Sequence, residues 1–121
     1  NRIVVQKWKK GIPDDMSLAI YYYSLVFAFN NLSVTEREIQ MVAFTAVKGN
    51  ISYAEIREAF CKLYSSSNPT INNMVSKLKK MNILIKDNGK VKVNPNICPK
   101  FETESIIIQI VLKNEKSAIS K

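Results

Sequence analysis

Histidine is absent from this chain of 121 residues, and the sequence contains only three glycines and two cysteines. Without histidine the chain lacks the most common general base of enzymes, and so few glycines leave no phosphate-binding loop. A structural metal site needs about four ligands, more than Cys61 and Cys98 supply. The glutamates are explained by helix capping and surface ion pairing. We therefore expect no catalysis, no metal, no cofactor and no small-molecule substrate.

Long apolar runs are also missing from the sequence. The most hydrophobic stretch, residues 18–29, is too short to cross a bilayer and contains three tyrosines. Cys61 falls among apolar residues of a helical segment, where a buried free thiol is the favoured interpretation. Free thiols are typical of the cell interior. We accordingly expect no membrane association and a cytoplasmic protein, located in the host cytoplasm or the virion if its source is a virus.

Acidic residues are scarce relative to basic ones, because 10 Asp and Glu stand against 18 Lys and Arg, a net charge of +8. The excess is also unevenly distributed. Residues 62–92 contain seven lysines and one acid, whereas residues 14–58 contain six acids and three bases. A polyanionic partner would explain this segregation. Two alternatives remain for the total charge, namely solubility and the lysine-rich composition that an AT-rich genome produces.

Residues 1–32 are predicted to form a β-prone strand over 2–8 and a helix that Asp14 or Asp15 caps and that ends near Asn30. One face of this helix comprises Leu18, Tyr21, Tyr22, Leu25 and Phe29, and the opposite face comprises Ile20, Tyr23 and Phe27. A helix that is apolar all round is expected to be buried all round. We therefore predict that the face with Ile20, Tyr23 and Phe27 is an oligomer interface or is covered by a terminal strand.

Three capped helices are predicted next, in a segment that spans residues 33–97 together with a hairpin. The first begins at Ser33 or Thr35 and ends at Gly49, the second begins with a capping box at Ser52, and the third is capped by Asn68 with Pro69 at its first position. Their expected inward residues are Ile39, Val42, Ala43 and Ala46; then Tyr53, Ile56, Phe60, Leu63 and Tyr64; then Ile71, Met74, Val75, Leu78 and Met81.

After the third helix the apolar pattern changes from helical to alternating. Residues 83–86 and 90–93 flank the turn Asp87-Asn88-Gly89, and Asn-Gly between two alternating runs indicates a β-hairpin with a type I′ turn. The final segment, residues 98–121, contains a β-prone run over 105–112 and a polar tail that is expected to fray. The strands expected over 2–8 and 105–112 would pair with each other or with a partner's sheet.

Residues 52–97 resemble the winged-helix domains of MarR-type regulators and of plasmid and phage replication initiators. In those families a segment like residues 68–84 forms the recognition helix and enters the first wing strand, and a segment like residues 86–90 forms the wing tip. Residues 93–97 are similar to a phrase that follows the wing in some replication initiators. The resemblance implies a mainly α fold with a small β-wing (α+β), namely a winged helix-turn-helix with an added N-terminal helix and β-prone termini. The wing departs from the MarR pattern because it carries lysine where those proteins have a conspicuous arginine for the minor groove.

The outward face of the third helix is the predicted nucleic-acid-binding site. This site comprises Asn68, Thr70, Asn72, Asn73, Ser76, Lys77 and Lys80 on the helix and Lys86 and Lys90 on the wing. Asparagine pairs with adenine through two hydrogen bonds, serine and threonine bind base edges or phosphate, and lysine binds guanine or phosphate. The alternative interpretation is a polar, solvated helix face with cations at its C-terminus.

We expect a protein that binds duplex DNA, either a transcriptional regulator or a replication-initiation component of a plasmid or phage. The alternative is a structural or assembly protein, for example of a viral particle, that uses the winged helix for protein contacts. That alternative is supported by the apolar helix over residues 14–30 and by the β-prone termini, which exceed what a lone winged helix needs. On either interpretation we expect a homo-oligomer or a partner protein.

Overall fold

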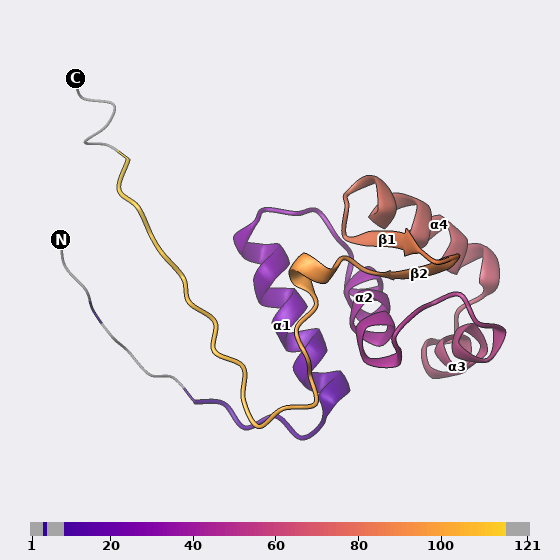
Figure 1. Ribbon diagram of the computed structural model, residues 1–121, viewed down its shortest axis with the longest axis horizontal. Coiled ribbons are helices and arrows are strands. Elements are labelled where there is room, and N and C mark those ends of the chain that lie inside the picture. Colours follow the sequence, from indigo (N-terminus) through magenta and orange to yellow (C-terminus); the bar gives the residue numbers. More distant parts are fainter. Residues whose placement is uncertain (1–3, 5–8, 116–121) are drawn as a thin grey trace.

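The computed structural model describes residue 4 and residues 9–115. Within them the chain forms four α-helices, α1 (Asp15–Phe29), α2 (Glu36–Lys48), α3 (Ala54–Tyr64) and α4 (Asn68–Lys80), then strands β1 (Leu84–Asp87) and β2 (Lys90–Val93) and a single 3-10 turn, η1 (Pro95–Ile97) (Figure 1). The architecture is thus mainly helical with one small antiparallel sheet, as the sequence predicts.

Helix α1 begins where the carboxylate of Asp14 accepts a hydrogen bond from the backbone N–H of Ser17 at 2.7 Å. This bond also lowers the pKa of Asp14. The helix packs against α2, and its residues Ala19, Tyr23 and Phe27 are at most 1% exposed. Tyr23 and Phe27 therefore lie in the core of their own chain, and the prediction that they form an oligomer interface is wrong. Ile20 is half-buried and packs against the same core.

The opposite face of α1 is the one that remains partly open to solvent. Tyr21 is 43% exposed and Phe29 is 55% exposed, and Leu32 in the following loop is 36% exposed. The helix is expected to be buried all round, and the described residues of its own chain leave this face partly uncovered. We refer to Tyr21, Leu25, Phe29 and Leu32 as the outer face of α1.

Helix α2 lies at the centre of the fold, between α1 and the hairpin (Figure 1). Thr35 and Glu38 form the predicted capping box at its start, and Gly49 ends it in a left-handed conformation, φ +97°. The consecutive residues from Met41 to Thr45 are all buried, because α1 covers one side of α2 and strand β2 covers another. The Thr45 hydroxyl satisfies its hydrogen-bonding requirement by donating to the Met41 carbonyl at 2.7 Å.

Helix α3 does not begin with the capping box expected at Ser52. The side chain of Asn50 instead accepts hydrogen bonds from the backbone N–H groups of Ser52 and Tyr53, at 2.9 and 3.2 Å. The Ser52 hydroxyl accepts from the backbone N–H of Val91 at 2.8 Å, and Ile51 N–H donates to the Val91 carbonyl at 3.0 Å. The loop before α3 is therefore fastened to strand β2.

Two side chains that were expected to point inward from α3 are exposed, Tyr53 at 43% and Leu63 at 59%. Phe60 is fully buried as predicted, while Ile56 and Tyr64 are half-buried. Helix α3 is short and makes limited contact with α2 and α4, so only part of its apolar stripe is covered.

Helix α4 is capped by Ser67, one residue before the predicted cap, so Asn68 is its first residue and Pro69 its second. Its inner residues are those predicted from the periodicity, namely Ile71, Met74, Val75 and Leu78, all at most 8% exposed. Met81 is half-buried at the C-cap. All other residues of α4 are exposed.

The predicted hairpin is confirmed, with Leu84 opposite Val93 and Asp87 opposite Lys90 in antiparallel register. At its tip Asn88 and Gly89 both have positive φ, 51° and 76°, as a type I′ turn requires. Its inner residues Leu84, Val91 and Val93 join the same core as the helices.

The chain after the hairpin returns to α1. The Tyr23 hydroxyl donates to the Ile97 carbonyl at 2.7 Å, and the Phe101 ring packs edge-on against Tyr22 and beside Tyr23. Burial raises the pKa of the Tyr23 hydroxyl, which keeps it protonated as a donor. The segments 1–32, 33–97 and 98–121 that the sequence suggests all contribute to one core.

The β-prone run over residues 105–112 forms no strand in the structure, so the prediction of a strand there is wrong. Ile106 is half-buried against the core, and the chain beyond it is exposed, with Ile107 at 91% and Leu112 at 86%. A strand pairs only where a neighbouring edge supplies hydrogen-bond partners, and the described residues offer none beside this segment. The strand predicted over residues 2–8 and the polar tail over 116–121 lie outside the described residues.

Candidate nucleic-acid interface

Asn73, Ser76 and Lys80 are exposed and follow one another at helical spacing along α4, opposite the buried stripe. None of the three makes a hydrogen bond or an ion pair within residues 9–115. Lys79 on the neighbouring flank is likewise exposed and unpaired in that part of the chain. The structure thus leaves an amide, a hydroxyl and two ammonium groups available for a ligand on one helix.

Lys77, by contrast, is turned toward α2. Its ammonium nitrogen lies 2.9 Å from Oε1 of Glu38, whose side chain is 9% exposed. Burial alone would raise the pKa of Glu38, but hydrogen bonds from the Thr35 backbone N–H and from Lys77 outweigh burial and lower the pKa. Lys77 therefore stabilises the α2–α4 contact, and the prediction that it stands free for phosphate is corrected.

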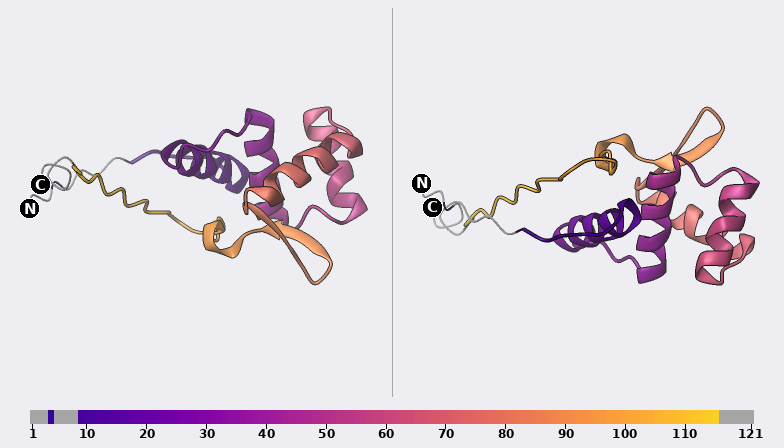
Figure 2. Two further views of the ribbon diagram at one scale, coloured as in Figure 1. Left: turned by 90° about the horizontal axis from the view of Figure 1, so that it is seen from above. Right: turned by 90° about the horizontal axis from the view of Figure 1, so that it is seen from below.

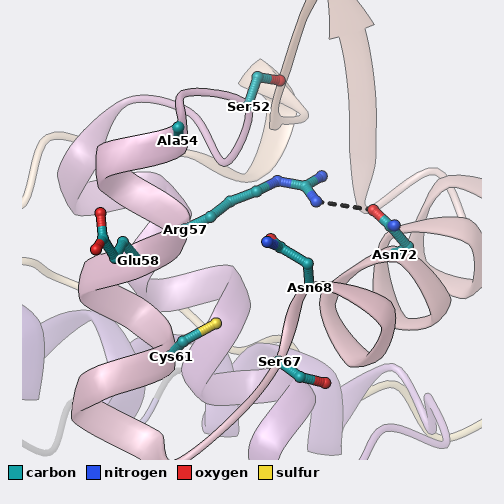
Figure 3. Close-up of a pocket in the computed structure, with 8 residues that line it drawn as sticks. All are labelled: Ser52, Ala54, Arg57, Glu58, Cys61, Ser67, Asn68 and Asn72. Atoms are coloured by element: carbon teal, nitrogen blue, oxygen red, sulfur yellow. Dashed lines mark hydrogen bonds between the residues drawn. The ribbon is translucent and has the colours of Figure 1, made fainter.

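The first five residues of α4 include three further predicted residues, and the structure gives them different surroundings. Thr70 Oγ1 lies 3.0 Å from the Ser67 hydroxyl, so it belongs to the cap of the helix. Asn72 Oδ1 accepts a hydrogen bond from Arg57 of α3 at 2.8 Å. Asn68 lines the depression between α3 and α4, where its amide points toward the Arg57 side chain (Figure 3).

The hairpin lysines also differ from one another. Lys86 is exposed on β1 and has no partner within the described chain. The ammonium of Lys90 lies over the ring of Tyr53 at 4.9 Å from its centroid, which places this charge at the start of α3 rather than beyond the hairpin tip. Lys92 pairs with Asp87 at 3.5 Å, and because their side chains are 36% and 54% exposed this pair contributes little to stability.

Arg57 is a residue beside α4 that sequence reasoning missed. Arg57 is one of three arginines in the chain, and its guanidinium connects the Ile51 carbonyl to the Asn72 amide across the depression (Figure 3). The sequence offers little indication of this role, because an arginine on the outer side of a helix usually belongs to a solvated face. Only the crossing of α3 and α4 brings it to Asn72.

Free thiols, metal-binding clusters and membrane-spanning helices bear on what else the described residues could do. Cys61 and Cys98 are free and half-buried. Among the described residues there is no cluster of three side chains able to hold a metal ion, and no helix has the length and apolar character needed to cross a membrane. Comparisons of the chain with protein-family models, with curated proteins and with solved structures found no match.

Proposed function

We propose that the chain is a winged helix-turn-helix protein that binds duplex DNA, with α4 as the recognition helix and the β1–β2 hairpin as the wing. The order of elements supports this, because α3 and α4 are joined by the short turn at residues 65–67 and the hairpin follows α4 directly. The bonds from Ile51 and Ser52 to Val91 further support it, since they hold the hairpin beside the start of α3.

The observation that carries the proposal is the unpaired outer line of α4. Asn73, Ser76 and Lys80 face solvent in the most basic part of the sequence, and α4 itself carries no acid. Of the acids on neighbouring elements, Glu38 is paired with Lys77 and Asp87 with Lys92, while Glu58 of α3 lines the depression beside Asn68 and Asn72. An exposed helix with amide, hydroxyl and ammonium groups and no free carboxylate suits the major groove, which offers base edges between two rows of phosphates. Both a transcriptional regulator and a replication-initiation component would use such a surface.

In this arrangement Asn73 and Ser76 contact base edges, and Lys80, Lys86 and Lys79 contact phosphates. Each lost phosphate contact should lower the slope of log K against log salt by about one. Lys80→Ala should therefore weaken binding to all duplexes alike. Asn73→Ala should cost about 1–3 kcal/mol on the preferred site and little elsewhere.

The test is a titration of the full chain against a random duplex pool at two salt concentrations. Lys10→Ala is the matched control, because it removes one lysine beside Tyr21 of α1, on the far side of the molecule from α4 (Figure 1). We expect the control to retain the salt slope of the unchanged chain. Absence of binding to any duplex at low salt, where screening is weakest, would contradict the proposal.

A structural or assembly role is the second candidate, and the outer face of α1 favours it. Tyr21 and Phe29 expose apolar surface, and the exposed segment at 107–112 exposes more. Exposed apolar surface of this kind is typical of a site that contacts another protein. If the duplex titration fails, the lysines of α4 and the hairpin would face an acidic protein surface instead.

A further inference from the structure

We propose that Arg57 is a positioning residue that makes Asn72 a hydrogen-bond donor toward DNA, so that α4 selects guanine rather than adenine at one base pair. This inference rests on the proposed duplex binding. It concerns a residue of α3 that the sequence did not assign to the interface.

The contact between the two residues determines how the Asn72 amide is turned. Arg57 Nη1 lies 2.8 Å from Asn72 Oδ1 (Figure 3). A guanidinium only donates hydrogen bonds, so the amide must present its oxygen to Arg57 and its NH₂ group elsewhere. That NH₂ group has no acceptor among the described residues. Asn72 therefore offers two N–H donors to a ligand beside a positive charge.

The guanidinium itself is held in place from the other side. Arg57 Nε donates to the Ile51 carbonyl at 2.9 Å, and Ile51 N–H donates to the Val91 carbonyl of β2 at 3.0 Å. Arg57 is thus anchored to the same loop that fastens the hairpin. A ligand that approaches α4 meets an amide whose orientation is fixed before binding, which reduces the entropy lost on binding.

The two purines differ in what they present to such a group in the major groove. Guanine presents two acceptors, N7 and O6, whereas adenine presents the N7 acceptor and the N6 amino donor. Asparagine reads adenine through its oxygen and its nitrogen together, and at Asn72 the oxygen is engaged by Arg57. An adenine amino group would also approach a guanidinium charge. Asn73 has no such partner, so its amide can turn either way.

The experiment is selection of bound sequences from a randomised duplex pool at low salt, with the full chain and three variants. We expect the unchanged chain to enrich guanine at one position of its site. Asn72→Ala should remove that enrichment at this position alone. Arg57→Ala should free the amide and raise the frequency of adenine relative to guanine there by roughly 5- to 150-fold.

Lys62→Ala is the matched control, because it removes one positive charge from the same helix, α3, and makes no contact with Asn72. It should leave the guanine preference unchanged. If Arg57→Ala fails to fold, Asn72→Ala still decides, since its side chain is exposed. Retention of the base preference by either variant, or an Arg57→Ala loss spread evenly over all sequences, would overturn the inference while leaving duplex binding intact. Absence of any duplex binding by the unchanged chain would overturn the proposed function as well.

Discussion

Glu38 of α2 accepts hydrogen bonds at a single oxygen, Oε1, from the Thr35 backbone N–H at 2.8 Å and from the Lys77 ammonium of α4 at 2.9 Å. One carboxylate therefore completes the start of one helix and attaches a second helix to it. The arrangement removes one lysine from the set available to a ligand. The charge of this one acid also contributes to the stability of the fold.

Lys77→Ala should lower the free energy of unfolding by about 0.5–1 kcal/mol, the range for a partly exposed ion pair. Urea denaturation followed by circular dichroism measures this. Lys79→Ala, which removes an exposed and unpaired lysine from the same helix, is the control and should stay within about 0.5 kcal/mol of the unchanged chain. Equal effects of the two substitutions would contradict the role given to the ion pair.

The pH dependence of unfolding should reflect the lowered pKa of Glu38, whose ordinary value is 4.5. A carboxyl whose pKa is lower in the folded state stabilises the fold above its unfolded pKa, and this stability is lost as pH falls through the folded value. Unfolding in urea at pH 7 and at pH 3 should therefore show a smaller difference for Glu38→Gln than for the unchanged chain. An identical pH dependence would show that Glu38 makes no contribution.

Gly89→Ala should destabilise the chain by about 1–2 kcal/mol, because φ at this position is +76° and alanine is strained in the left-handed conformation. No atom lies within 4 Å of the added Cβ, so crowding plays no part. Gly11→Ala is the matched control, since it has the same free space without a positive φ. Thermal denaturation should give a lower Tm for the first variant and an unchanged or higher Tm for the second.

Tyr23→Phe should cost about 1 kcal/mol, because it removes the hydroxyl that donates to the Ile97 carbonyl and keeps the buried ring. Tyr22→Phe provides the comparison, since no hydrogen bond of its hydroxyl is found in the described structure. Urea denaturation of both variants should separate them, and equal stability would contradict the importance of the Tyr23 bond.

The outer face of α1 predicts self-association or a partner. We expect light scattering of the full chain to give a mass above that of one chain, and Phe29→Glu to reduce it with little change in helix content. Phe29 is 55% exposed, so the substitution should not disturb the core. Ala28→Glu, at an exposed position one residue away, is the control. A monomeric mass for the unchanged chain would leave this face without a role in self-association.

Periodicity and turn chemistry were sufficient to predict α4 and the hairpin, because their buried residues repeat regularly and Asn88-Gly89 admits few alternatives. The same patterns could not predict which face of α1 is buried, because both faces are apolar. The contacts of α1 with α2 and with Phe101 determine which face is covered. These patterns also could not assign Ser52, whose spacing to Glu55 matches a capping box although its true partner, Val91, is 39 residues away.

The candidate site was predicted in the same uneven way. The exposure of Asn73, Ser76 and Lys80 can be predicted from helical periodicity alone, because the three residues lie opposite the buried stripe of α4. Two other contacts could not be predicted. Lys77 pairs with Glu38, which is 39 positions away, and Arg57 pairs with Asn72, which is 15 positions away. Each pair joins two helices, and the sequence does not specify how those helices cross. Such contacts depend on tertiary geometry, and they decide which polar groups remain free.

The return of the chain to α1 after the hairpin has a practical consequence for labelling. Because Ile97 and Phe101 are fixed to Tyr22 and Tyr23, the described chain approaches α1 and departs from it on the side away from α3 (Figure 2). A fluorophore or surface tether attached to either described end would stand well clear of α4. Immobilised chains would then keep the basic helix accessible, so single-molecule and surface-based measurements are feasible without redesign of the core.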